Sequence, residues 1–245
     1  DYALDPEDLR KVILTLAVRG KLVRQEEGDG SAEELLTSIA KEMKSNSTET
    51  DKQHFDNTKG MFDLPKGWIW ARFDSVAKIA SNLVHPREYM DSKHLAPDNV
   101  EKGTGRLLSC RTVREDKITS SKHHFYPGQI VYSKIRPNLS KIVIVDFEGL
   151  CSADMYPIES YINSRYLLLF MLSNFFLQQA VKNDTRVAMP KINQTELNAI
   201  MMSVPPLAEQ NRIVAKVDEL IGVIEQIQSN LAAEKMKREL LLQAL

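Results

Sequence analysis

The last 39 residues of the chain carry the feature that most restricts its fold. Residues 207–245 contain no proline and one glycine, and apolar side chains recur there at alternating spacings of four and three residues. This is the a/d pattern of a coiled-coil seam. The seam consists of Ile213, Val217, Leu220, Ile224, Ile227 and Leu231. At 1.5 Å per residue the helix extends roughly 58 Å, more than a domain of this size can bury. We therefore expect it to protrude and pack on a partner, the alternative being an amphipathic helix folded onto its own domain.

The remainder of the chain predicts helices first and strands later. Apolar residues at helical spacing predict a helix over 6–19, and a capping box formed by Ser31 and Glu34 predicts a second helix to about residue 43. Strands are predicted by runs of β-branched and aromatic residues at 68–73, 128–135, 141–147 and 200–204. Residues 163–181 are apolar on one side and predict a further helix.

These elements predict an α+β fold, with a mixed, strand-rich domain followed by a long protruding coiled-coil helix. The expected segments are an N-terminal helical segment at 1–44, a polar linker at 45–63, the strand-rich domain at 64–204 and the long helix at 205–245. We expect the N-terminal helices to pack near the distal end of the long helix.

Charge is distributed unevenly, although the net charge is only −1. Residues 1–64 hold nine Lys or Arg and 14 Asp or Glu, whereas residues 102–141 hold nine Lys or Arg and two acids. The following 19 residues hold four acids and no Lys or Arg. A local positive field attracts nucleic acid, because each neutralised phosphate releases counterions. The other interpretation of such a run is an ordinary solvated face.

Three groups of residues have side chains suited to DNA. Base edges are read by Arg, Lys, Asn, Gln or His, and phosphates are contacted by cations. The first group is Arg111, Arg114, Lys117, Lys122, His123 and His124. The second group, beside a predicted turn at 137–138, is Lys134, Arg136, Asn138 and Lys141. Arg186 and Lys191 bracket another loop. The sequence does not separate base contacts from phosphate contacts.

One enzymatic alternative has a formal motif. Pro97-Asp98 followed by Glu115-Asp116-Lys117 matches the pattern of a metal-dependent nuclease, in which two carboxylates hold Mg²⁺. Asp98 lies in a polar stretch and not on an apolar strand, so the nuclease remains a minor alternative. We expect no catalytic residues in this chain.

Cofactor, metal and membrane features are not expected either. Cys110, His123, His124 and Cys151 lack the close paired spacing of structural zinc sites. Two cysteines do not form a disulfide framework, which favours a reducing cytoplasm. No apolar run reaches the ~20 residues that a membrane span requires.

Several stretches resemble one protein family. They are residues 64–68 (LPKGW), 205–214 (PPLAEQNRIV) with the heptad helix that follows, and 14–23 (LTLAVRGKLV); 128–137 (GQIVYSKIRP) is also similar. The family is the specificity subunits of type I restriction–modification enzymes.

The resemblance implies a non-catalytic subunit that recognises double-stranded DNA. Members of this family hold two target-recognition domains, each reading half of a split site, joined by two long helices. The helices pack together and dock methyltransferase (modification) subunits, which restriction subunits then join. This sequence has one such domain and one such helix, so we expect either the N-terminal half of a longer subunit or a half-subunit that dimerises. The alternative function is a scaffold whose basic residues bind an acidic protein.

Overall fold

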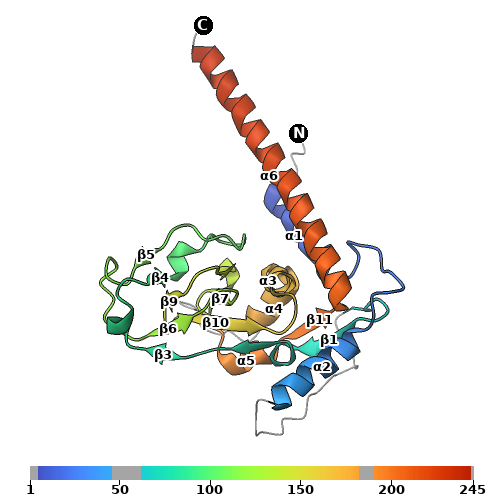
Figure 1. Cartoon of the computed structure of the whole chain (residues 1–245). Coiled ribbons are helices and arrows are strands. Elements are labelled where there is room, and N and C mark those ends of the chain that lie inside the picture. The colour runs from blue at the N-terminus through green and yellow to red at the C-terminus, as the bar shows by residue number, and fades with distance from the viewer. Residues whose placement is uncertain (1–4, 46–61, 182–189, 244–245) are drawn as a thin grey trace.

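The computed structural model describes residues 5–45, 62–181 and 190–243. Figure 1 shows a layered head of strands and short helices from which one long helix rises. The predicted polar linker at 45–63 falls almost wholly outside the described residues. None of the helices in the described ranges is both long and apolar enough to cross a bilayer.

The two N-terminal helices form where the sequence predicts them. In α1 (Pro6–Val18) the Asp5 carboxylate accepts a hydrogen bond from the Glu7 amide at 2.9 Å, and in α2 (Ala32–Ser45) the Ser31 hydroxyl accepts one from the Glu33 amide at 3.0 Å. These bonds satisfy amides that have no partner within the helix.

The position predicted for these helices is wrong. Helix α1 packs beside the first half of α6 (Leu207–Gln243) and not near its distal end (Figure 1). Helix α2 packs against the 3₁₀ turn η1 (Phe73–Ser75) in the head. The reason is apolar burial: Leu14 and Val18 of α1 share one core with Ile213 of α6.

The described strands form three sheets. Their bounds are β1 (Ile69–Arg72), β2 (Ala77–Ile79), β3 (Leu83–Val84), β4 (Lys93–Leu95), β5 (Arg111–Thr112), β6 (Lys122–Phe125), β7 (Ile130–Ser133), β8 (Ile142–Ile144), β9 (Gly149–Cys151), β10 (Met155–Ser160) and β11 (Met201–Val204). The orders are β1-β11, β2-β10-β7-β8 and β3-β6-β9-β4-β5, and among these described pairs only β4 with β9 is parallel. Strands at the predicted positions, with helices before and after them, confirm the α+β class.

Three further 3₁₀ turns and three short helices complete the head. The turns are η2 (Pro86–Tyr89), η3 (Pro97–Asn99) and η4 (Pro137–Leu139), and the third helix is α5 (Gln194–Asn198). The helix predicted over 163–181 is two helices, α3 (Ser164–Leu172) and α4 (Asn174–Val181). The break lies at Ser173, whose hydroxyl donates to the Phe170 carbonyl at 2.6 Å and so competes with the helical pattern.

The four-stranded sheet is buried on both faces. Ile130 and Tyr132 of β7 point into the larger core, shared with the helices. Val131, between them, points into a smaller core with Phe125 of β6 and Cys151 of β9. Alternate residues of a strand face opposite sides, so the head consists of a helical layer, the four-stranded sheet and the five-stranded sheet.

Helix α6 has a buried proximal part and an exposed distal part. Ile213 and Val217 are fully buried and Ile224 is nearly so, whereas Ile227 and Leu231 are 52% and 60% exposed. The sequence predicts that the whole seam faces a partner, and for Ile213 and Val217 this is wrong. Both side chains lie in the chain's own core, against residues of α1 and α3. Only the distal part remains available to a partner (Figure 1).

This division of the seam predicts unequal mutational effects. Ile213→Ala should lower the free energy of unfolding by about 2–4 kcal/mol, because it leaves a cavity in the core. Leu231→Ala, a matched truncation on the exposed part, should change it by less than about 0.5 kcal/mol. Denaturant unfolding of the isolated chain at low concentration measures both. Equal effects would contradict the division of the seam.

Candidate nucleic-acid interface

The connection between β7 and β8 presents a strained, cationic turn. Arg136 and Ser140 have left-handed backbone angles, with φ of 49° and 44°, on either side of η4. Such conformations cost a non-glycine residue about 1–3 kcal/mol and are found preferentially at functional sites. The Arg136 amide donates to the Pro190 carbonyl at 2.8 Å, and the Gly103 amide donates to the Ser140 carbonyl at 3.3 Å. The turn is thus fixed from both sides while the side chains of Arg136 and Asn138 are exposed.

Other predicted DNA-binding residues lie beside this turn. A β-bridge pairs Ile135 with Lys191, which brings the second and third groups of the sequence together. The Lys191 ammonium lies 3.3 Å from an Asp154 carboxylate oxygen, and the Lys134 ammonium lies 4.9 Å from the ring centre of Tyr156. We call Lys134, Arg136, Asn138, Lys141 and Lys191 the β7–β8 cluster. Arg186, from the same predicted group as Lys191, lies outside the described residues.

The β7–β8 cluster retains an excess of positive charge. It holds four cations, of which, among the described residues, Lys191 contacts the carboxylate of Asp154 and the Lys141 ammonium lies 3.4 Å from that of Asp98. Among the residues that the structure describes, the Arg136 guanidinium forms no ion pair. An exposed guanidinium without a carboxylate partner is available to bind an external anion or a base edge.

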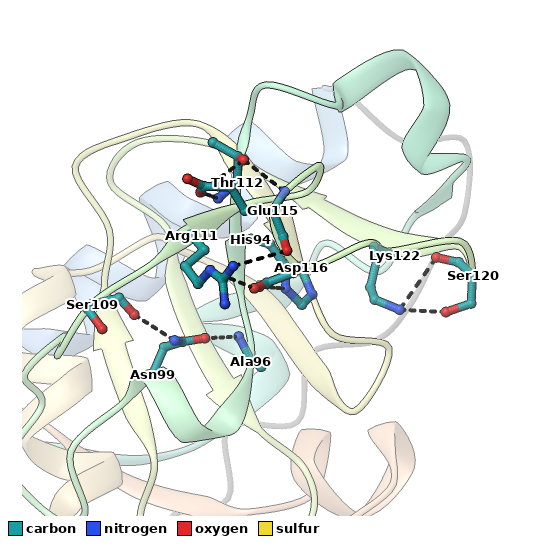
Figure 2. A network of polar contacts seen from close by, with 10 residues as sticks. All are labelled: His94, Ala96, Asn99, Ser109, Arg111, Thr112, Glu115, Asp116, Ser120 and Lys122. Atoms are coloured by element: carbon teal, nitrogen blue, oxygen red, sulfur yellow. Dashed lines mark hydrogen bonds and ion pairs between the residues drawn. The ribbon is translucent and has the colours of Figure 1, made fainter.

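Strand β5 and the turn after it carry Arg111, Arg114 and Lys117, but carboxylates offset this charge. Figure 2 shows Arg111 beside Asp116 and His94. Arg111 lies 3.5 Å from Asp116, whose other oxygen lies 2.8 Å from the ring nitrogen Nδ1 of His94. Arg114 donates to a carboxylate oxygen of Asp91 through Nε at 3.1 Å and through a terminal nitrogen at 3.0 Å.

The third acid on this turn is Glu115. The backbone amide and hydroxyl of Thr112 donate to its carboxylate and hold the pKa of Glu115 below its usual value. Arg111 and Arg114 are therefore each paired with a carboxylate, and Glu115 adds a third negative charge beside the single further cation, Lys117. The local field of this turn is thus weaker than the sequence run suggests.

Lys122, His123 and His124 are buried in β6, which corrects the prediction that they face DNA. Each side chain is less than 9% exposed. The Lys122 ammonium donates to the hydroxyl of Ser120 at 2.7 Å (Figure 2), His123 Nδ1 lies 2.6 Å from the Asn82 carbonyl oxygen, and His124 Nε2 lies 2.8 Å from Glu148. Burial lowers the pKa of Lys122 and of His123. These polar residues are covered because β6 is an inner strand, between β3 and β9, and because η2 lies over it. The Tyr89 ring of η2 contacts the His124 ring.

The nuclease alternative gains no support. Asp98 contacts Lys141, and Glu115 is held by Thr112, so each carboxylate of the motif has its own local partner. Within the described ranges, no three His, Cys, Asp or Glu side chains are placed to hold a metal ion. Burial also raises the pKa of the Cys110 and Cys151 thiols, which disfavours the thiolate that a metal would need.

Sequence reasoning missed three residues of interest. Asp154, directly before β10, contacts the β7–β8 cluster through its ion pair with Lys191 and its backbone bond to Lys134. The sequence shows it only as one acid of an acidic stretch. Val223 and Met236 are 49% and 61% exposed on α6. Val223 stands four residues before Ile227, so helical spacing could have identified it.

Comparison with known proteins gives one family. A family model described as the type I restriction modification DNA specificity domain matches residues 92–234, from β4 to the exposed part of α6. The chain is 40% identical over 219 residues to the EcoDI specificity subunit of Escherichia coli, covering 89% of this chain and 47% of that protein. It is 27% identical over 237 residues to the EcoAI specificity subunit of the same species, covering 89% of this chain and 40% of that protein.

A solved structure shares the fold. The HsdS subunit from Thermoanaerobacter tengcongensis superposes with a TM-score of 0.65 at 23% identity, over 76% of this chain and 50% of that chain. The chain therefore spans about half the length, or less, of the relatives it matches. Because the family model covers more than half of the chain, this protein belongs to the family of type I restriction–modification DNA specificity domains, as its sequence motifs predicted.

Proposed function

We propose that this chain reads one half of a split double-stranded DNA site as a non-catalytic part of a type I restriction–modification complex. Its distal helix docks a methyltransferase subunit, and restriction subunits join through that complex. Membership of the specificity-domain family and 40% identity to a named specificity subunit support this proposal. The single observation that carries it beyond the family is Arg136, which is exposed on a fixed turn of the head and forms no ion pair with the residues that the structure describes.

The β7–β8 cluster supplies the side chains that recognition requires. A guanidinium can donate two hydrogen bonds to guanine, and an asparagine amide can form two hydrogen bonds with the major-groove edge of adenine, so Arg136 and Asn138 are the candidates for base contacts. Lys134 and Lys191 are held nearby and suit phosphate oxygens, which set the register of the protein on the duplex. The left-handed backbone keeps the turn rigid, and a rigid reader loses little entropy on binding.

The distal part of α6 supplies the docking surface. Val223, Ile227 and Leu231, spaced four residues apart on one side of the helix, are all exposed where α6 extends away from the head. An exposed apolar row on a long helix favours a helical partner. We propose that the row binds the methyltransferase subunit together with a second recognition half, carried either by a longer chain or by a second copy.

Replacing Arg136 tests the reading turn. In the complex of this chain with its methyltransferase subunit, Arg136→Ala should weaken binding of the cognate site by roughly 1–3 kcal/mol if Arg136 contacts a base. If it contacts a phosphate instead, the slope of log affinity against log salt should fall by about one unit. Titration of labelled duplex at several salt concentrations measures both quantities.

Arg114→Ala is the matched control for that experiment. It also removes one exposed arginine, but one that is already paired with Asp91, so its effect should be smaller. If neither variant changes the affinity or the salt slope, the β7–β8 cluster does not bind DNA. Normal assembly without DNA binding would then favour the scaffold alternative.

Charges on the exposed row test the docking surface. Ile227→Asp with Leu231→Asp should abolish co-purification with the methyltransferase subunit, because two carboxylates would be buried in an apolar contact. Gln226→Asp with Ser229→Asp adds the same charge at exposed positions off the row and should leave assembly intact. Survival of the complex in the first variant would place the docking surface elsewhere.

A further inference from the structure

The base of α6 is held by hydrogen bonds to buried side chains of its first turn. Glu209 and Gln210, in the first turn of the helix, are both fully buried. The Trp68 indole N–H donates to Glu209 Oε2 at 2.8 Å, and the Gln25 amide donates to the same oxygen at 3.2 Å. Gln25 also donates to the Lys66 carbonyl at 2.7 Å. The helix is thereby joined to the loop after α1 and to the segment that precedes β1.

A bidentate ion pair holds the next turn of α6. Both terminal nitrogens of Arg212 lie 2.6 Å from the two carboxylate oxygens of Asp29, and Arg212 also donates to the Arg24 carbonyl at 3.3 Å. The guanidinium keeps the pKa of Asp29 below its ordinary value. The Asp29 side chain is only 7% exposed, so this pair is shielded from water more than a surface ion pair is.

The opposite side of α6 is held by the start of α3. The Asn163 amide donates to Gln210 Oε1 at 3.0 Å, and its side chain donates to the Asn211 side chain at 2.7 Å. Arg165 donates to Asp218 at 2.8 Å. The first three turns of the helix are therefore bonded on two sides.

Backbone segments meet closely at the same place. A side chain on Gly20, which has φ of 65°, would come within 2.4 Å of the Pro65 ring, and Gly67, with φ of 79°, lies against the Gly30 carbonyl and the Pro206 ring. Residues 14–23, 64–68 and 205–214, the three stretches of the family resemblance, thus converge on one joint. We call Gln25, Asp29, Trp68, Glu209 and Arg212 the helix seat.

We propose that the helix seat determines the direction in which α6 leaves the head, with Trp68, Glu209 and Arg212 as positioning residues. Apolar contacts alone are non-directional and allow a helix to roll or pivot, whereas hydrogen bonds are strongly directional. The displacement that a tilt of the helix causes grows with distance from the seat. From Arg212 to Leu231 the axis measures roughly 28 Å at 1.5 Å per residue, so a tilt of about 10° displaces Leu231 by about 5 Å.

That displacement matters for DNA if the proposed function holds. A shift of about 5 Å exceeds the 3.4 Å rise of one base pair. The seat would therefore select the spacing between two half-sites as well as stabilise the chain. This part of the inference rests on the proposed function, whereas the fixed direction of the helix does not.

Distance measurements between head and helix test the inference directly. In a Cys110→Ser background, spin labels at Asp98→Cys on the head and Lys235→Cys on the helix report their separation, with unlabelled chain in excess to suppress intermolecular signals. Cys151 is fully buried and should not react. We expect a narrow distribution for the parent chain. Trp68→Phe and Arg212→Lys, which remove one indole donor and one bidentate fork, should each widen it by about twofold.

Two controls separate positioning from stability. Lys216→Ala with Glu219→Ala removes an exposed ion pair within α6, in which the ammonium and carboxylate oxygen lie 2.8 Å apart, and should leave the distribution narrow. The double variant Asp29→Arg with Arg212→Asp exchanges the two charges. Its distance distribution should be narrower than that of Arg212→Lys. Should Trp68→Phe fail to fold, by circular dichroism, Arg212→Lys still decides the result. Narrow distributions in folded seat variants, with only a loss of unfolding free energy, would overturn the proposal.

A second readout uses the assembled complex. The parent complex should prefer one spacing between half-sites, and Arg212→Lys should tolerate spacings that differ by about one base pair. A parent complex that binds no duplex would refute the proposed function but not the distance result. An unchanged spacing preference alongside a wider distance distribution would refute the link between the seat and DNA.

Discussion

Burial of the proximal part of α6 is the interaction on which the remaining structure depends. Ile213 and Val217 join α1, α3 and the four-stranded sheet in a single core, so the helix that extends from the head is also part of its interior. Enclosure of the proximal part is a precondition for holding the exposed distal part in a fixed direction relative to the head, because it brings the hydrogen-bonding residues of the helix seat together. A helix attached through a flexible loop could carry the same apolar row, but it could not relate the position of a bound partner to the position of the reading turn.

The sequence predicted the elements well and the contacts between them less well. Helical spacing identified α6, and strand runs identified β1, β7, β8 and β11, because both patterns depend on neighbouring residues alone. The same spacing could not distinguish Ile213 from Leu231, since an apolar side chain in a seam looks alike whether α1 or another protein covers it. The position of α1 depends on contacts more than 190 residues apart in the chain, such as Arg10 with Glu225, and no local pattern encodes them.

Charge was predicted from a linear window, and folding changed the balance within it. The basic run at 102–141 contains two acids. Three further acids, Asp91, Asp98 and Asp154, lie outside the run in the sequence but form ion pairs with the candidate DNA-binding residues in the folded chain. Asp91 offsets charge at the turn after β5, together with Glu115 and Asp116, whereas Asp98 and Asp154 contact the β7–β8 cluster and leave it with an excess of cations. The histidines of β6 illustrate the same limit, because two layers cover a strand whose polar sequence suggests exposure. Arg136 was among the candidates, but its left-handed backbone and lack of an ion pair were not visible in the sequence.

Three of the motifs that identify the family lie in the joint, and a fourth, residues 128–137, leads into the reading turn and ends at Pro137. Residues 14–23, 64–68 and 205–214 meet at the helix seat, where glycines, prolines and a buried glutamate are required by close packing and not by any DNA sequence. A joint that sets geometry tolerates few changes, whereas a turn that reads bases must differ between proteins with different targets. Such motifs therefore indicate how a chain is assembled and carry no information about which sequence it reads. Target choice is expected to reside in exposed side chains beyond these motifs, such as Asn138, which the turn holds in place without dictating its identity.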